Sequence, residues 1–191
     1  MTIRAIIFDC FGVLYANPVL VLASRCKTKD QSLEIQELGR ALQSGLISLD
    51  AFIAKAARYT NSSDKDITEL MQKSLVRYDE VFDYAWQLKE RGYRLAVLSS
   101  IGSDSVSRLF TKMERTELFD AIVASGGTSA SKPSPSAFEV TIDRLNVSPE
   151  ESIMIDDWSV NIEAAKSVGL KGVEFISLTD CRRQVEELLN A

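Results

Sequence analysis

The chain has 191 residues, of which 46% are hydrophobic and 26% are charged, as in an ordinary globular protein. Its net charge of −5 and the absence of a dense Lys/Arg block argue against a nucleic-acid or anionic-membrane partner. No apolar run approaches the roughly 20 residues that span a bilayer, so we expect one sizeable core with at most a small additional lobe.

Two residue types narrow the chemistry. The sequence has no histidine, which excludes Ser-His-Asp and Cys-His nucleophile systems and histidine-ligated metal sites. Metal chemistry therefore falls to carboxylates, which suit hard cations such as Mg²⁺. The three cysteines, Cys10, Cys26 and Cys181, are too scattered for a disulfide framework, and the first apolar stretch is too short for a signal peptide. We therefore expect a cytoplasmic protein.

The first predicted element is a buried strand over residues 3–8 that ends at an acid. In the stretch "IRAIIFDCFGVLY", apolar residues lead into Asp9, and an aromatic residue, Phe11, follows two positions later. A carboxylate at the end of a buried strand is costly unless a partner or a metal needs it. Asp9 is therefore a candidate functional residue, with a structural hydrogen-bond acceptor as the alternative.

The next segment, residues 15–80, favours short helices and contains no convincing strand. Helices are predicted over residues 33–42, 49–59 and 67–78, and residues 61–64 combine a turn with helix-start chemistry. We expect this segment to form a helical lobe, or cap, inserted into a core domain of residues 1–14 and 81–191. The alternative is that these helices simply pack on the sheet.

From residue 81 onward, predicted helices and strands alternate. The strands are short and rich in Val, Ile or Phe, and Gly92 and Gly169 fall where helix-ending glycines belong. This alternation predicts a doubly wound, mostly parallel α/β sheet with right-handed crossovers. The predicted strands cover residues 94–98, 120–124, 152–155 and 172–176, and the predicted helices cover 81–91, 103–112, 136–145, 160–168 and 179–189.

Polar residues follow four of the predicted strands, at the sheet edge where ligands of parallel sheets bind. Ser99 could instead cap a helix, and Lys132 could be a solvated loop residue. Asp156 and Asp157 are harder to explain structurally, because adjacent acids repel unless a cation or a lysine compensates. The residues at this edge are Asp9, Ser99, Ser100, Lys132, Asp156, Asp157 and Asn161.

Four motifs in this order resemble those of haloacid dehalogenase superfamily hydrolases. They are "FDCFGVL", "LAVLSS", "SKPSPSAF" and "IDDWSVNIEAAKSVGLKGV", and the resemblance covers nearly the whole chain. It implies a Rossmann-like core with a small helical cap at the position of the inserted segment. Any one motif is weak evidence, whereas four in order with the right strand contexts are strong evidence.

The resemblance implies a nucleophile and a metal site. Asp9 would attack phosphorus to form an aspartyl-phosphate. Mg²⁺ would be held by Asp9, the Phe11 backbone carbonyl and Asp157, with Asp156 counted in the metal site as its support and Asn161 holding a metal-bound water.

The same resemblance implies a phosphate site. Ser99 would donate to a phosphate oxygen, and Lys132 would add positive charge and restrain the acids. Backbone N–H groups in the turn after Asp9 would form an anion nest. The expected catalytic residues are Asp9, Ser99 and Lys132, and the expected substrate-binding residues are Cys10, Phe11, Gly12, Ser99, Ser100 and Lys132.

Phe11 departs from the pattern, because phosphatases of this superfamily usually carry a general-acid Asp at that position. General acids contribute about 10²–10⁴-fold. Three readings follow: a Mg²⁺-dependent phosphatase that manages without this acid, a 2-haloacid dehalogenase whose halide leaves without a proton, or a non-catalytic binding module.

The paired acids favour the phosphatase. By the resemblance, the dehalogenases need no metal, lack the paired acids, and typically have Asn where this chain has Ser100. We therefore expect a Mg²⁺-dependent phosphatase that hydrolyses a small phosphorylated metabolite and has no nucleic-acid or membrane partner. The sequence specifies neither the substrate nor the oligomeric state.

Overall fold

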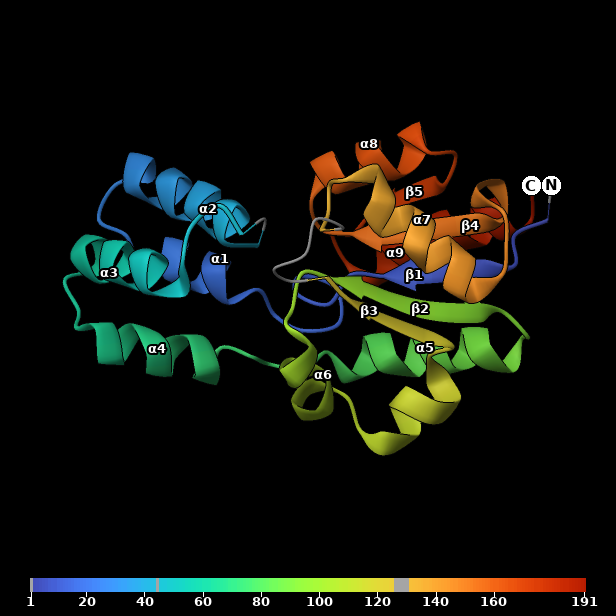
Figure 1. Cartoon of the computed structure of the whole chain (residues 1–191), viewed down its shortest axis with the longest axis horizontal. Helices are drawn as coiled ribbons and strands as arrows, with labels where there is room; N and C mark the ends of the chain where they lie inside the picture. Colours follow the sequence, from blue (N-terminus) through green and yellow to red (C-terminus); the bar gives the residue numbers. More distant parts are fainter. Residues whose placement is uncertain (1, 44, 126–130) are drawn as a thin grey trace. The chain divides into compact units, whose positions relative to one another are not determined.

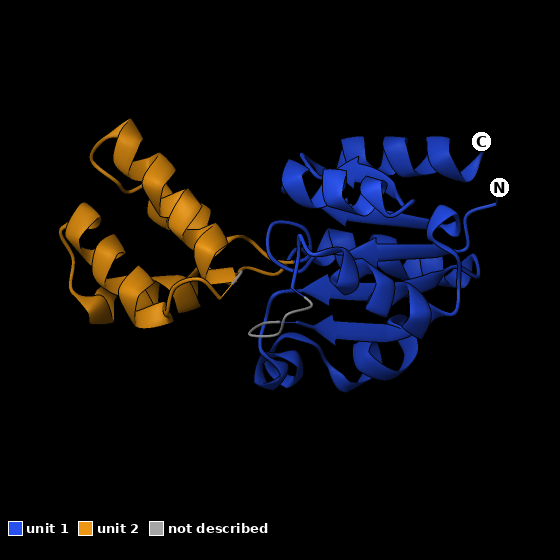
Figure 2. Cartoon of the chain, turned by 45° about the horizontal axis from the view of Figure 1, so that its top comes forward, with its two compact units in different colours: residues 1–14, 78–191 blue, residues 15–77 orange. Residues whose placement is uncertain are grey.

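A computed structural model describes residues 2–43, 45–125 and 131–191. The chain divides into two compact units, one formed by Met1–Leu14 and Tyr78–Ala191 and the other by Tyr15–Arg77 (Figure 2). Each unit has its own buried hydrophobic cluster. Within the described ranges, no helix is both long enough and apolar enough to cross a membrane.

The first unit is built on a five-stranded parallel sheet with the order β3-β2-β1-β4-β5 (Figure 1). Helices alternate with these strands along the chain, so the predicted doubly wound α/β core is confirmed. The strands are β1 (Ala5–Phe8), β2 (Arg94–Ser99), β3 (Ala121–Ala124), β4 (Ser152–Asp156) and β5 (Lys171–Glu174).

Helices cover both faces of this sheet, as Figure 1 shows for α5 and α7. Ile7 of β1 shares one hydrophobic cluster with Phe138 of α7. On the other face, Phe8 contacts the Phe119 ring edge-on, and Phe119 in turn contacts Phe82 of α5. The helices of this unit are α5 (Asp79–Glu90), α6 (Ser103–Leu109), α7 (Pro135–Leu145), α8 (Ser159–Ser167) and α9 (Leu178–Leu189).

β1 is the central strand, and its register fixes which residues meet at the sheet edge. Phe8 lies opposite Val97 of β2 and Ile155 of β4. The residue after Phe8 therefore follows directly beside the ends of these two neighbouring strands. Every residue of β1 and β4 is buried, which explains why these strands read as continuous apolar runs rather than alternating ones.

One predicted helix, over residues 103–112, is shorter in the structure. α6 ends at Leu109, and a separate π-helical turn spans Glu114–Leu118. The buried Glu114 carboxylate accepts a hydrogen bond from the Thr111 backbone N–H at 2.8 Å. This local contact separates the turn from α6.

The second unit consists, in its described residues, of α1 (Pro18–Ala23), α2 (Lys29–Gln43), α3 (Leu49–Thr60) and α4 (Asp64–Lys73). These helices bury a common apolar cluster that includes Leu22, Ile35, Phe52, Ala56 and Ile67. The sequence did not predict α1, although the Asn17 side chain accepts a hydrogen bond from Val19 N–H and Pro18 opens the helix.

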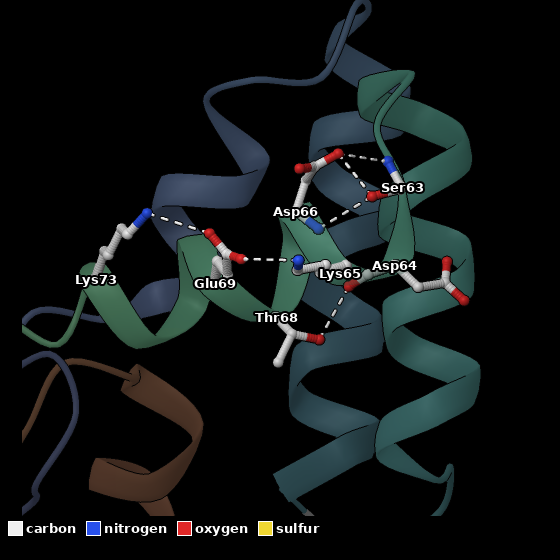
Figure 3. A network of polar contacts seen from close by, with 7 residues as sticks. All are labelled: Ser63, Asp64, Lys65, Asp66, Thr68, Glu69 and Lys73. Carbon is white, nitrogen blue, oxygen red and sulfur yellow. Dashed lines mark hydrogen bonds and ion pairs between the residues drawn. The ribbon is translucent and has the colours of Figure 1, made fainter.

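The predicted turn and helix start at residues 61–64 are confirmed. Asn61 ends α3 with φ of 55°, and Ser63 caps α4. The Ser63 hydroxyl accepts from the Asp66 N–H at 3.2 Å, and the Asp66 carboxylate accepts from the Ser63 N–H at 3.0 Å (Figure 3). This capping box sets the start of α4 at Asp64. Because α4 ends at Lys73, the predicted bounds of 67–78 were wrong at both ends.

Candidate active site

Three carboxylates meet at the carboxyl edge of the sheet. Asp9 follows β1, Asp156 is the last residue of β4, and Asp157 comes directly after it. One oxygen from each lies within 4.8 Å of the other two. Asp9 is 7% exposed, Asp156 is fully buried and Asp157 is half-buried, so two of the three carboxylates are largely shielded from water. Buried like charges at this spacing repel strongly unless positive charge compensates.

Lys132 supplies part of that compensation. Its ammonium nitrogen lies 2.7 Å from Asp9 Oδ1 and 2.6 Å from Asp156 Oδ2, and its side chain is 4% exposed. The residue sits just ahead of α7, on the loop that follows β3. The three acids and this lysine alone carry two more negative charges than positive ones.

Asp156 is held by donors on both of its oxygens. Besides Lys132, it accepts hydrogen bonds from the Trp158 backbone N–H at 2.9 Å and from Asn161 Nδ2 at 3.0 Å to each oxygen. Asn161 reaches it from the first turn of α8. Both Asp156 oxygens are thus occupied by hydrogen bonds from Lys132, Trp158 and Asn161.

Burial and neighbouring charges shift the pKa values of Asp9 and Lys132. Burial is the main cause that raises the pKa of Asp9 to about 7; Lys132 opposes it, and the negative charges of Asp156 and Asp157 add to it. Burial alone would lower the pKa of Lys132, but the charges of Asp156 and Asp9 outweigh burial and raise it above its usual range. The two neighbouring carboxylates thus favour the charged form of Lys132.

The residues predicted to bind phosphate follow β1 and β2. Ser99 ends β2 and is 2% exposed, and its carbonyl accepts hydrogen bonds from Ser125 N–H at 2.8 Å and from the Ser125 hydroxyl at 3.1 Å. Burial raises the pKa of the Cys10 thiol, which lies close enough to Ser99 for a hydrogen bond. Cys10 can therefore contribute its backbone N–H but not a thiolate. Phe11, Gly12 and Ser100 are half-buried.

Gly12 makes room for Asp157. Its φ of +94° lies in the region that favours glycine, and a Cβ atom built on it would lie 2.8 Å from Asp157 Cβ and overlap the Asp157 carboxyl group. The second acid of the pair thus occupies the space of the missing side chain. The sequence predicts Gly12 only as a substrate-binding residue, and nothing in the sequence signals this contact.

The residues at this edge fit a hard divalent cation. Carboxylate oxygens are the ligands that Mg²⁺ prefers, and the cluster has an excess of negative charge. Among the described residues, no donor reaches the buried Asn161 Oδ1, which leaves an acceptor suited to a water molecule. The structure thus brings together Asp9, Lys132, Asp156, Asp157 and Asn161, with Ser99 beside Cys10 on the neighbouring strand end.

Comparison with known sequences identifies a family. A family model described as haloacid dehalogenase-like hydrolase matches residues 27–175. Drimenol cyclase of Aspergillus calidoustus is 27% identical over 196 residues; the match covers 99% of this chain but only 37% of that protein. Pyrophosphatase PpaX of Bacillus mycoides is 22% identical over 183 residues, covering 91% of this chain and 83% of that protein.

Comparison with solved structures agrees on the fold. An L-2-haloacid dehalogenase matches with a TM-score of 0.73 at 18% identity, covering 100% of both chains. A haloacid dehalogenase family enzyme of Bacteroides thetaiotaomicron, in complex with magnesium and inorganic phosphate, matches with a TM-score of 0.60 at 20% identity, covering 90% of this chain and 93% of that chain. Since the family model spans most of the chain and the α/β core agrees with it, this protein belongs to the haloacid dehalogenase-like hydrolases.

Proposed function

We propose that this hydrolase is a Mg²⁺-dependent phosphatase that acts on a small phosphorylated metabolite through an aspartyl-phosphate. The observation that carries the proposal is the meeting of Asp9, Asp156 and Asp157 around one lysine. A halide-releasing enzyme has no use for this excess of negative charge, whereas a phosphatase that binds Mg²⁺ needs it. One relative is named a pyrophosphatase, an enzyme that acts on a small phosphate compound, and this also favours a phosphatase.

Asp9 is the proposed nucleophile, and Asp157 and the Phe11 backbone carbonyl complete the proposed metal ligands. Mg²⁺ bound there would neutralise the phosphate oxygens and lower the pKa of Asp9, keeping that carboxylate ionised for attack. One Asp9 oxygen forms a bond to phosphorus while the bond to the leaving group breaks. Water then attacks phosphorus, releases phosphate and regenerates Asp9.

The remaining residues position the phosphate. Lys132 contributes a fixed positive charge next to the Asp9 oxygen. We propose that the Ser99 hydroxyl and the backbone N–H groups of Cys10 and Phe11 donate to phosphate oxygens, with Ser100 and Gly12 completing the loop around them. Because transfer of a phosphoryl group depends mainly on position and charge, these groups need not exchange protons.

We propose that the second unit, Tyr15–Arg77, is a cap that selects the substrate. Its two ends are joined by an antiparallel bridge between Tyr15 and Arg77, so both connections to the first unit leave from one place. Tyr15 comes six positions after Asp9, so the first of these connections directly follows the proposed active-site loop in the sequence. We also propose the cytoplasm as its place of action, because the sequence has only three scattered cysteines.

A 2-haloacid dehalogenase is the second candidate, because Phe11 offers no proton and a halide leaves without one. The two candidates differ in their need for metal. A panel of phosphorylated metabolites with Mg²⁺, beside 2-chloropropionate without metal, separates them. We expect phosphate release that EDTA abolishes and no chloride release.

Asp9→Asn is the control for this panel, because its amide keeps the shape of the carboxylate but cannot act as a nucleophile. It should abolish turnover while the circular dichroism spectrum stays unchanged. Chloride release without metal would establish the dehalogenase, and near-normal phosphatase activity in Asp9→Asn would exclude the covalent route.

A further inference from the structure

We propose that this site acts on phosphates whose leaving group departs as a weakly basic anion, namely acyl phosphates and phosphoanhydrides, rather than on alkyl phosphates. The inference rests on the proposed phosphatase and narrows its substrate class. It follows from the groups that the structure describes around Asp9 in the first unit, among which no side chain is suited to protonate a leaving oxygen.

Phe11 is the first of these groups. It follows the proposed nucleophile by two positions, on the short loop that Gly12 turns with a φ of +94°. Its backbone carbonyl is a proposed metal ligand, and its phenyl ring has no ionisable hydrogen. A proton donor at this place would protonate the leaving group as its bond to phosphorus breaks, which typically contributes about 10²–10⁴-fold.

The charged side chains that act on Asp9 cannot replace this donor. They are Lys132, Asp156 and Asp157. Asp156 is fully buried and accepts hydrogen bonds on both oxygens, so neither oxygen is available to a leaving group. Lys132 is 4% exposed, and its ammonium group already lies between two carboxylates. Asp157 is a proposed metal ligand, so its oxygens would face the cation rather than a leaving group.

The neutral groups that the structure describes beside Asp9 offer no better donor. The Cys10 side chain is fully buried. Ser99 can donate a hydrogen bond to phosphate, but an aliphatic hydroxyl is too weak an acid to protonate an alkoxide efficiently. The segment 126–130, which lies outside the described residues, contains only Gly, Thr, Ser and Ala in the sequence and so adds no carboxyl group.

Without a donor, the leaving group takes the whole electron pair of the broken P–O bond. An acyl phosphate then releases a carboxylate and a phosphoanhydride releases a phosphate, both of which are stable anions in water. An alkyl phosphate must release a strongly basic alkoxide. The Asp9–phosphorus bond forms equally in each case, and the later attack by water on the aspartyl-phosphate is identical for all. The difference between substrates therefore lies entirely in the first step.

The test is a leaving-group series measured with Mg²⁺ in single turnover, so that the chemical step is observed. The substrates are acetyl phosphate, pyrophosphate, substituted phenyl phosphates and simple alkyl phosphates. Across the phenyl and alkyl phosphates, the logarithm of the rate should fall steeply as the pKa of the leaving group rises, and acetyl phosphate and pyrophosphate should react faster than every alkyl phosphate. A flat series with clear turnover would overturn this inference alone, because it requires a proton donor. If no phosphate at all is turned over, the proposed phosphatase itself is wrong.

Two variants sharpen the test. Phe11→Asp places a carboxyl group two residues after the nucleophile and should flatten the slope, helping alkyl phosphates most, by up to about 10²–10⁴-fold. Phe11→Leu removes the ring without adding an acid and should keep the wild-type slope. If Phe11→Leu flattens the slope as much as Phe11→Asp, the ring acts sterically and the inference fails. Should Phe11→Asp not fold, as judged by its melting curve, the wild-type slope still decides.

Discussion

At the scale of single residues, Gly12 leaves room for Asp157, an acid that is far from it in the sequence but adjacent to it in space. Asp157 occupies the space where a Gly12 side chain would be, so a methyl group there must push the Asp157 carboxylate aside. Gly12→Ala should therefore weaken Mg²⁺ binding by about 10–100-fold, as the loss of a group that orients a ligand typically does. Isothermal titration with Mg²⁺ measures the change.

Gly92 offers a matched control for this variant. Its φ of +90° is close to that of Gly12, but a Cβ atom there would meet no other atom within 4 Å. Gly92→Ala should share the backbone strain, about 1–2 kcal/mol of unfolding free energy, and leave Mg²⁺ affinity unchanged. Equal Mg²⁺ affinities for the two variants would show that the contact with Asp157 has no role in metal binding.

Asp9 also makes the metal-free protein sensitive to pH. Burial, opposed by Lys132, raises the pKa of Asp9 from 3.8 to about 7 in the folded protein. Between these two values the folded protein keeps a proton that the unfolded chain has lost, so the contribution of Asp9 to the unfolding free energy falls as the pH rises through this window.

In EDTA, the melting temperature of the wild type should therefore fall between about pH 5 and about pH 7.5. Asp9→Asn has no carboxyl group to titrate at this place and should show a smaller fall over the same range. The comparison uses differential scanning calorimetry in the same buffers for both proteins. Identical pH profiles would mean that Asp9 titrates normally in the folded state.

The sequence predicts the site residues unequally, and the reason is physical. Asp9, Asp156 and Asp157 were predictable because each is an acid at the end of an apolar strand, and parallel strands end at the same edge. The role of Gly12 was not, because it depends on the distance between two loops. The four hydrogen bonds that Asp156 accepts from Lys132, Trp158 and Asn161 likewise become visible only once α8 and the loop before α7 are placed next to β4.

At the scale of elements, local hydrogen bonds decide where helices begin and end. The hydrophobic pattern predicted a helix from residue 67, yet α4 begins at Asp64 because Ser63 and Asp66 satisfy each other's backbone N–H groups. Periodicity reports only which face of a helix is buried. It cannot place the first turn, whose residues in α4 are exposed.

The Ser63 cap gives a test at this scale. Ser63→Ala should destabilise the start of α4 by about 1 kcal/mol, seen as roughly fivefold faster hydrogen exchange of the Asp66 and Ile67 amides. Ser62→Ala is the neighbouring control, because the Ser62 hydroxyl contacts Thr60 and caps no helix. Equal exchange rates in the two variants would show that the capping box adds nothing to α4.

At the scale of the whole molecule, two separate cores imply two separate responses to metal. Asp9, Asp156 and Asp157 all belong to the first unit, whereas the cluster around Phe52 and Ile67 belongs to the second. A ligand that binds only a folded state stabilises that state. Mg²⁺ should therefore slow hydrogen exchange at amides of β1 and β4 and leave those of α3 and α4 unchanged.

Asp157→Ala completes this test, because it separates the repulsion among the three carboxylates from their proposed binding of Mg²⁺. In EDTA the variant should melt at a higher temperature than the wild type, since one of three crowded carboxylates is gone and the repulsion falls. With Mg²⁺ the order should reverse, because only the wild type keeps the full set of proposed ligands and gains RT ln(1 + [Mg²⁺]/Kd). NaCl at the same ionic strength controls for screening, which acts on both proteins alike. If Mg²⁺ fails to raise the melting temperature of the wild type, the cluster does not bind it, and Lys132 alone balances these acids.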